Sequence, residues 1–189
     1  MSDKAKDENV DVAVFVGSLR EGSFSRKVAR ALVELARPPL KLSLVDIGNL
    51  PLFNQDDEDR PPRPWVDLRE RVRAADAVLF VTPEYNRSVP AALKNALDVG
   101  SRPEGKNVWN GKPGGVVSVT PYSLGGFGAN HHLRQVLVYL NVPTMAQPEA
   151  YVSHADKLFD ERGALKNDGT RELLTTFLDA FVSWVGKMR

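Results

Sequence analysis

The stretch that decides the fold is Val12-Ala-Val-Phe-Val-Gly-Ser-Leu-Arg-Glu-Gly-Ser-Phe-Ser-Arg-Lys-Val-Ala-Arg-Ala-Leu32. Its first five residues are apolar and mostly β-branched, which predicts a buried strand over 12–16. A turn rich in hydroxyl groups follows, and the helical spacing of apolar residues then begins at Phe24. A strand, such a turn and a helix N-terminus in this order favour an anion site, because the first N–H groups of a helix have no partner within it.

The turn itself carries the donors that a phosphate needs. Ser18, Ser23 and Ser25 offer hydroxyl groups, and Arg20 offers a charged fork. An ordinary strand–helix turn with serine as the N-cap explains the same residues. The spacing matches neither the nucleoside-triphosphate P-loop nor the dinucleotide-binding fingerprint.

The bulk composition narrows the class of protein. The chain has 189 residues, 42% of them hydrophobic, and a formal net charge of +1. We expect a flexible N-terminal tail over 1–11 and one domain over 12–189, with no nucleic-acid partner, no membrane association and a cytoplasmic location. Cysteine is absent, which excludes disulfides, thiolate nucleophiles and cysteine metal sites. Redox chemistry would therefore need a bound cofactor.

Short apolar strands alternate with amphipathic helices along the whole chain. The predicted strands cover 12–16, 40–45, 77–82, 114–119 and 142–146; the predicted helices cover 24–36, 65–75, 89–99, 126–140 and 171–187, with a polar loop over 54–64. This alternation indicates a parallel sheet covered on both faces, in the flavodoxin-like doubly wound order 2-1-3-4-5. In such sheets ligands bind beyond the carboxyl ends of the strands, where the loops after strands one, three and four converge.

The loop after the third strand, Thr82-Pro-Glu-Tyr-Asn-Arg-Ser-Val-Pro90, has unusual chemistry. Pro83 and Pro90 stiffen it, Tyr85 offers a flat face to a ring system, and Asn86 offers hydrogen-bond donors. A rigid turn before a helix is the simpler alternative. The loop after the fourth strand, 120–128, contains three glycines, which permit close backbone approach to a ligand or a flexible helix entry.

Other conspicuous residues have structural explanations. His131 and His132 are adjacent, so they point in different directions on a helix, and we expect surface or interface positions and no metal site. Trp65, Trp109 and Trp184 are expected to pack in the core or at an interface. The acidic run at 56–59 is expected to be solvated.

Taken together, the loops resemble those of the NADPH-dependent FMN reductase family, and within it the bacterial chromate and quinone reductases. The resemblance runs over 12–149 and also rests on Leu93-Lys-Asn-Ala-Leu-Asp98, Gly111-Lys-Pro113 and His132-Leu-Arg-Gln135. It implies that FMN binds to Ser18, Leu19, Arg20, Ser23, Phe24, Ser25, Pro83, Glu84, Tyr85, Asn86, Arg87 and Thr120. Within this set it assigns the phosphate to Ser18, Arg20 and Ser25, and the isoalloxazine to residues 84–87 and Thr120.

Three positions depart from the family pattern. Ser25 stands where relatives usually have Asn, and Arg87 replaces an aromatic residue. Gly128 stands where some relatives place an Arg that meets the equivalent of Glu149 between subunits. The resemblance implies a homodimer or homotetramer, with the helix around 92–99 near a subunit interface.

The function implied is NAD(P)H-dependent reduction of quinones through FMN, with chromate as an opportunistic acceptor. We hypothesise two stages, in which NAD(P)H delivers hydride to FMN and leaves before the acceptor takes its place. The flavin carries the chemistry, so we assign no catalytic side chain. The alternatives are a flavodoxin-like electron-transfer protein, an azo- or arsenical-resistance-type flavin reductase, and a nucleotide-binding module without flavin.

Overall fold

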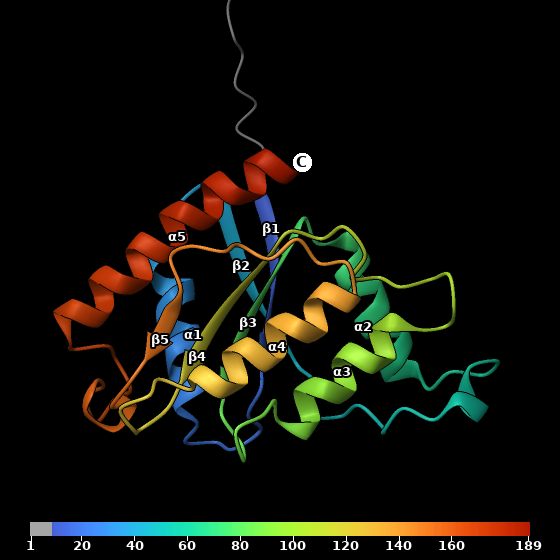
Figure 1. Cartoon of the computed structure of the whole chain (residues 1–189), viewed down its shortest axis with the longest axis horizontal. Helices are drawn as coiled ribbons and strands as arrows, with labels where there is room; N and C mark the ends of the chain where they lie inside the picture. Colours follow the sequence, from blue (N-terminus) through green and yellow to red (C-terminus); the bar gives the residue numbers. More distant parts are fainter. Residues whose placement is uncertain (1–8) are drawn as a thin grey trace, which may run out of the picture.

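The computed structural model describes residues 9–189 as a five-stranded parallel sheet with helices on both faces (Figure 1). The strands are β1 (Val10–Val16), β2 (Leu40–Val45), β3 (Ala77–Pro83), β4 (Gly114–Val119) and β5 (Ala150–Val152). The helices are α1 (Phe24–Leu35), α2 (Arg63–Ala74), α3 (Ala91–Ser101), α4 (Phe127–Tyr139) and α5 (Asp168–Met188), with short 3-10 turns at Gln55–Asp57 and Ala155–Lys157. The strand order is β2-β1-β3-β4-β5, which confirms the predicted flavodoxin-like doubly wound fold.

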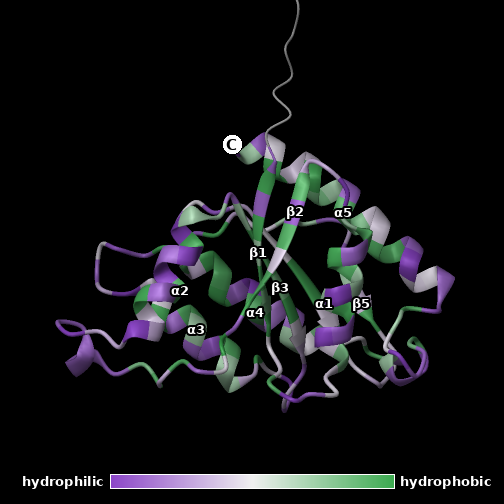
Figure 2. Cartoon of the chain, turned by 180° about the vertical axis from the view of Figure 1, so that it is seen from behind, coloured by the Kyte–Doolittle hydropathy of each residue, from purple (hydrophilic) through white to green (hydrophobic). Residues whose placement is uncertain are grey.

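Alternation along the central strands divides the core into two layers. Val12, Val14 and Val16 pack in the layer that α1 and α5 cover. Ala13 and Phe15 point the other way, into the layer under α2, α3 and α4. Figure 2 shows hydrophobic residues running along the strands between these layers. The near-continuous apolar strands are therefore buried on both faces, as parallel sheets require.

An aromatic cluster anchors the second layer. Phe15 stacks on Phe80 with ring centroids 5.5 Å apart, and Trp109 meets Phe15 edge-on at 5.2 Å. The indole nitrogen of Trp109 donates to the Leu97 carbonyl oxygen at 2.9 Å, so its polar atom is satisfied in the core. Trp65 is also fully buried, and Trp184 is partly buried. The packing predicted for the tryptophans is confirmed.

The first strand begins earlier than predicted. β1 starts at Val10, so Val10 and Asp11 belong to the sheet and not to the tail, whose remaining residues 1–8 lie outside the described part of the chain. The Asp11 carboxylate accepts hydrogen bonds from the Arg71 guanidinium at 2.9 and 3.0 Å. Its backbone N–H donates to the Asp76 carboxylate at 2.8 Å. Polar partners supplied by other elements let a charged residue continue the strand, which the local pattern did not reveal.

The last strand lies later than predicted. The predicted segment 142–146 does run along β4, because Met145 N donates to Gly114 O and Gly114 N donates to Pro143 O. It forms only an isolated bridge between Gly114 and Thr144, and the continuous pairing is made by Ala150–Val152 with Val117–Val119. Pro143 has no N–H to continue a ladder. The chain therefore leaves the edge of the sheet after Met145 and rejoins it at Ala150.

Helix boundaries differ from prediction by a few residues at most. α5 begins at Asp168, three residues early, because the side chain of Asn167 accepts a hydrogen bond from Thr170 N at 2.8 Å and caps the helix. α2 begins at Arg63 inside the predicted loop, with a proline in its first turn. Among residues 9–189, no helix is both long and apolar enough to cross a bilayer.

Candidate functional site

A cavity of about 580 Å³ opens at the carboxyl ends of the central strands. Three loops surround it at the lower edge of the sheet in Figure 1, following β1, β3 and β4. The lining residues are Ser18, Arg20, Ser23, Phe24, Ser25, Pro83, Glu84, Tyr85, Asn86, Arg87, Val119, Thr120, Pro121, Tyr122, Ser123, Leu124 and Gly126. The convergence expected at the topological switch point of the sheet is thus observed.

The loop after β1 supplies the polar end of the cavity. Ser23 is the N-cap of α1, and its hydroxyl accepts a hydrogen bond from Arg26 N at 3.3 Å. Within residues 9–189 the N–H groups of Phe24 and Ser25 have no acceptor, and the hydroxyls of Ser18 and Ser25, two largely buried residues that line the cavity, have no protein partner. These groups form a donor cradle at a helix N-terminus, which favours an anion.

Arg20 adds positive charge beside this cradle. Its side chain is exposed, and its guanidinium lies 5.5 Å from the centroid of the Phe24 ring. Leu19 is the one predicted site residue that does not line the cavity. Its side chain borders a separate depression together with Ile47, on the other side of the loop. Neighbouring residues of an extended loop point in opposite directions, which explains why Leu19 faces away while Ser18 and Arg20 face the cavity.

The loop after β3 forms a tight turn at the cavity. Tyr85 and Ser88 exchange two backbone hydrogen bonds, of 3.1 and 2.9 Å. Between them, Asn86 and Arg87 both have left-handed backbone conformations, with φ of +50° and +65°. Two consecutive positive φ values are typical of a type I′ turn, and a side chain such as that of Arg adopts them at a cost in free energy. The turn presents Tyr85 and Asn86 to the cavity.

Glu84 has a different environment from its neighbours in the turn. Its carboxylate is 12% exposed and accepts two hydrogen bonds: Oε1 from Arg87 Nη1 at 2.8 Å, and Oε2 from Ala129 N at 3.0 Å. Ala129 lies in the first turn of α4, whose N-cap is a glycine without a capping side chain. The Glu84 carboxylate therefore caps α4 from another loop, where a negative charge is favourable. Both of its oxygens are engaged by protein.

The loop after β4 closes the apolar end of the cavity. The hydroxyl oxygen of Thr120 accepts a hydrogen bond from Tyr122 N at 3.3 Å. Gly125 and Gly126 have positive φ, and a Cβ atom on Gly125 would lie 2.6 Å from Cβ of Tyr151. Tyr122 and Leu124 also line the cavity and are largely exposed, although sequence reasoning missed both. The available signal was the presence of large side chains in a loop made mostly of small residues.

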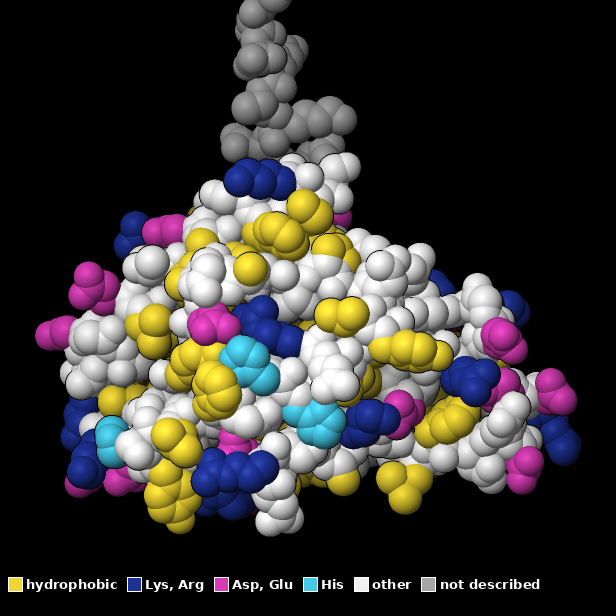
Figure 3. All heavy atoms as spheres, in the orientation of Figure 1, with side chains coloured by type: hydrophobic (Ala, Val, Ile, Leu, Met, Phe, Trp, Pro, Cys, Tyr) yellow, Lys and Arg dark blue, Asp and Glu magenta, His cyan; other side chains and the backbone are white. Residues whose placement is uncertain are grey.

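The two adjacent histidines of α4 have separate partners. His132 Nδ1 lies 2.8 Å from Ser88 Oγ, whereas His131 Nε2 lies 2.8 Å from the Tyr151 hydroxyl on β5. Burial raises the pKa of Tyr151 to about 12, and the neighbouring Glu149 contributes further. Figure 3 shows histidine side chains among hydrophobic ones on the face that α4 presents. The predicted surface position of both residues is confirmed.

The cavity has the shape and chemistry for a phosphate-bearing planar ligand. Its volume falls in the range of roughly 300–1,000 Å³ typical of cofactor and small-molecule sites. The loop after β1 contributes free hydroxyls, helix N–H groups and Arg20, and the loops after β3 and β4 contribute Tyr85, Tyr122 and Leu124. An anion and a flat ring system joined by a short chain match these two sets of residues. The residues that line the cavity therefore fit FMN, which has a phosphate, a short chain and a flat ring system.

The proteins that this chain resembles include flavin-dependent reductases. The family model described as NADPH-dependent FMN reductase matches residues 10–157. The chain is 60% identical over 175 residues to a quinone reductase from Pseudomonas putida, covering 92% of this chain and 94% of the relative. It is 43% identical over 178 residues to a 2-hydroxy-1,4-benzoquinone reductase from Burkholderia sp, covering 94% and 97%. The solved structure of FerB, a flavoenzyme NAD(P)H:(acceptor) oxidoreductase from Paracoccus denitrificans, superposes with a TM-score of 0.90 at 38% identity, covering 95% of this chain and 98% of FerB.

Proposed function

The chain belongs to the NADPH-dependent FMN reductase family, and from this premise we propose that it is an NAD(P)H-dependent quinone reductase with FMN in the cavity. The observation that carries the proposal is the meeting of an anion cradle and a ring-binding turn in one cavity of suitable size. In this proposal residues 10–189 act as one FMN-binding domain in the cytoplasm.

The polar end of the cavity holds the FMN phosphate. Ser18 and Ser25 donate their free hydroxyls, and the first N–H groups of α1 complete the cradle. Arg20 supplies the charge, as a planar fork suited to phosphate oxygens. Ser25 has a shorter reach than Asn would, so this chain relies more on Arg20. Ser23 contributes by holding the helix N-terminus in place, because its hydroxyl is engaged by Arg26 N.

The other end holds the ring. Tyr85 and Asn86 border it from the turn after β3, and Thr120 borders it from the loop after β4. When bound, FMN supplies the hydride and electron transfer. The chain orients the ring, excludes water with Tyr122 and Leu124, and leaves one face open to the substrates. Glu84 acts indirectly, since both of its carboxylate oxygens already have protein partners.

The open face accepts NAD(P)H and then a flat acceptor. Quinones fit because a planar ring stacks on a planar ring, as in the two relatives whose names specify a quinone. Chromate is a secondary, opportunistic acceptor. Arg87 lies at the mouth with a side chain that is 71% exposed, and it attracts the phosphates of the nicotinamide nucleotide and other anions.

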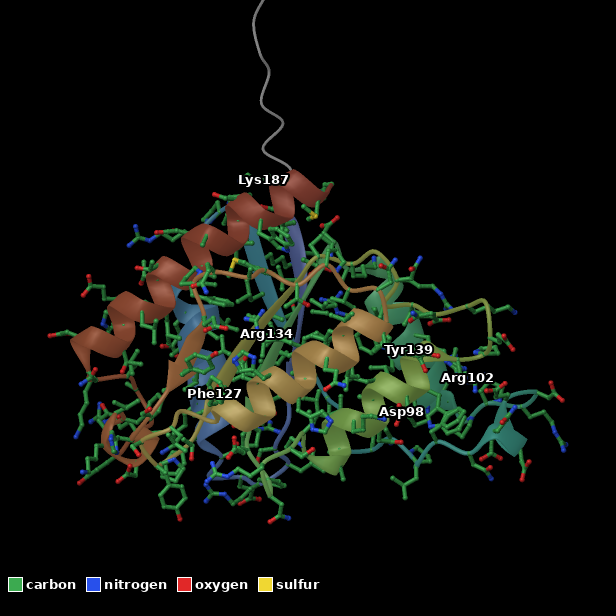
Figure 4. All side chains as sticks on the ribbon, viewed as in Figure 1. Asp98, Arg102, Phe127, Arg134, Tyr139 and Lys187 are labelled. Atoms are coloured by element: carbon green, nitrogen blue, oxygen red, sulfur yellow. The ribbon has the colours of Figure 1, made fainter. Side chains whose placement is uncertain are left out.

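The proposed assembly is a homodimer or homotetramer. Apolar side chains are exposed along α4, with Phe127 at 52%, Val138 at 76% and Tyr139 at 90%. Figure 4 shows Phe127 at the start of this helix and Tyr139 at its end, near Arg102, the residue that follows α3. Exposed apolar surface of this kind favours contact with another subunit.

Steady-state oxidation of NADPH and NADH by the FMN-loaded protein tests the proposal. We expect turnover that depends on added benzoquinone and exceeds that of free FMN at the same concentration. Chromate should be reduced more slowly. A protein that retains FMN but shows no turnover with any acceptor would instead be an electron-transfer protein, and the enzymatic proposal would be wrong.

A further inference from the structure

The turn Tyr85–Ser88 rests on the first turns of α4 through two side-chain hydrogen bonds. Ser88 Oγ and His132 Nδ1 are 2.8 Å apart. Glu84, immediately before the turn, accepts a hydrogen bond from Ala129 N at 3.0 Å. The partners are 44 and 45 residues apart in sequence, so these contacts join two different walls of the cavity.

Gly128 makes this approach possible. A Cβ atom at position 128 would lie 2.9 Å from Glu84 Oε2 and 3.2 Å from the Arg87 carbonyl oxygen. Contacts between a carbon and an oxygen at such distances are repulsive, and the Arg87 oxygen belongs to the backbone. The turn can therefore occupy its present position because residue 128 has no side chain. Together, the bonds of Glu84 and Ser88 and the space at Gly128 are termed the α4–turn contact below.

The turn needs an external support. Asn86 and Arg87 are non-glycine residues in the left-handed region, and both are exposed. Such conformations persist where the surrounding structure holds them. The two backbone bonds between Tyr85 and Ser88 close the turn but do not fix it relative to the sheet. The α4–turn contact supplies that second constraint.

We infer that the α4–turn contact fixes Tyr85 and Asn86 against the cavity, and that His132 and Gly128 are positioning residues for the substrates. This inference rests on the proposed function, because the turn would border the FMN ring on which NAD(P)H and the quinone bind. Neither His132 nor Gly128 lines the cavity, so each acts through the turn. The cradle after β1 is independent of this contact, so FMN phosphate binding should not change.

Hydrogen exchange tests the contact without requiring turnover. In His132→Ala and Ser88→Ala we expect the amides of residues 84–88 to exchange about 5-fold faster, the factor for losing one net hydrogen bond. His132→Asn can place an amide group near the position of Nδ1 and should restore slow exchange. His131→Ala is the matched control, since His131 bonds to Tyr151 and leaves the turn untouched. The inference would be overturned if the amides of residues 84–88 exchanged in His132→Ala at the wild-type rate. It would also be overturned if they exchanged as fast in His131→Ala as in His132→Ala.

Kinetics then test the consequence for substrates. We expect His132→Ala and Ser88→Ala to raise KM for benzoquinone and NAD(P)H about 5-fold. The double variant should be no worse than either single variant, because both remove the same bond. Additive effects would contradict the shared contact. If the wild-type protein shows no turnover, the proposed function fails, whereas the exchange result still decides whether the contact exists.

Discussion

At the scale of single residues, some residues of the site can be recognised from the sequence. The roles of others become clear only from their contacts in the fold. Ser18, Arg20 and Ser25 lie between a buried strand and the first turn of a helix, so local order is enough to propose them as donors to an anion. Glu84 could not be understood in this way, because its partner Ala129 is 45 residues away. The same holds for Gly128, whose role depends on how closely Glu84 and Arg87 approach it.

Arg20 gives the most direct test of the phosphate site. We expect Arg20→Ala to weaken FMN binding by about 10- to 150-fold, because hydrogen bonds to charged groups contribute about 1.5–3 kcal/mol. Fluorescence titration of the apoprotein with FMN measures this change. Arg30→Ala, at an exposed position on α1, is the control. An unchanged FMN affinity in Arg20→Ala would remove Arg20 from the phosphate site.

The substitution Gly128→Ala should affect the stability of the protein and the geometry of the site in different ways. Alanine is favoured over glycine in a helix by up to about 1 kcal/mol, so we expect Tm to stay constant or rise. The added Cβ must push Glu84 or the Arg87 carbonyl away, so KM for the quinone should rise several-fold. Thermal unfolding and steady-state kinetics on the same sample measure both effects. If Gly128→Ala had the wild-type KM, and its amides of residues 84–88 exchanged at the wild-type rate, the space at Gly128 would not be required to position the turn.

At the scale of elements, the position of the last strand, β5, could not be predicted, although β2 at the other edge of the sheet could. β2 and β4 occupy their predicted residues, because β2 alternates apolar and polar residues and β4 is rich in valine. β5 has three residues and follows a segment interrupted by Pro143 and Pro148, so its length falls below what periodicity can resolve. Pairing with β4 determines its position, and that pairing is not a local property of the sequence.

The raised pKa of Tyr151, on β5, predicts that folding stability depends on pH. The pKa of Tyr151 is raised from its ordinary value of 10.0 to about 12, chiefly by burial and further by Glu149. The pKa of Tyr151 is higher in the folded than in the unfolded protein. The contribution of neutral Tyr151 to the free energy of unfolding is therefore fully present below pH 10, and it is lost as the pH rises through about 12. Absorbance of tyrosinate at 295 nm should show a component ionising at about pH 12 that Tyr151→Phe removes. Persistence of that component in Tyr151→Phe would show that Tyr151 is not its source.

At the scale of the whole molecule, the topology brings the chemistry together. The order β2-β1-β3-β4-β5 places β1, β3 and β4 side by side, so the loops that follow them meet at one edge. The predicted order was therefore sufficient to place eleven of the twelve predicted site residues around one cavity, with Leu19 outside it. The strand order could not predict the hydrogen bonds that connect the turn after β3 to α4. Bonds such as Ser88–His132 depend on side-chain positions in three dimensions.

We propose that this cavity holds FMN and passes electrons from NAD(P)H to a quinone. The most direct test of this proposal is an anaerobic titration of the FMN-loaded protein, followed through the visible absorbance of the flavin. We predict that one equivalent of NADPH removes this absorbance and that one equivalent of benzoquinone restores it. Flavin absorbance that does not change on addition of NADPH or NADH, in protein that retains its FMN, would contradict the account.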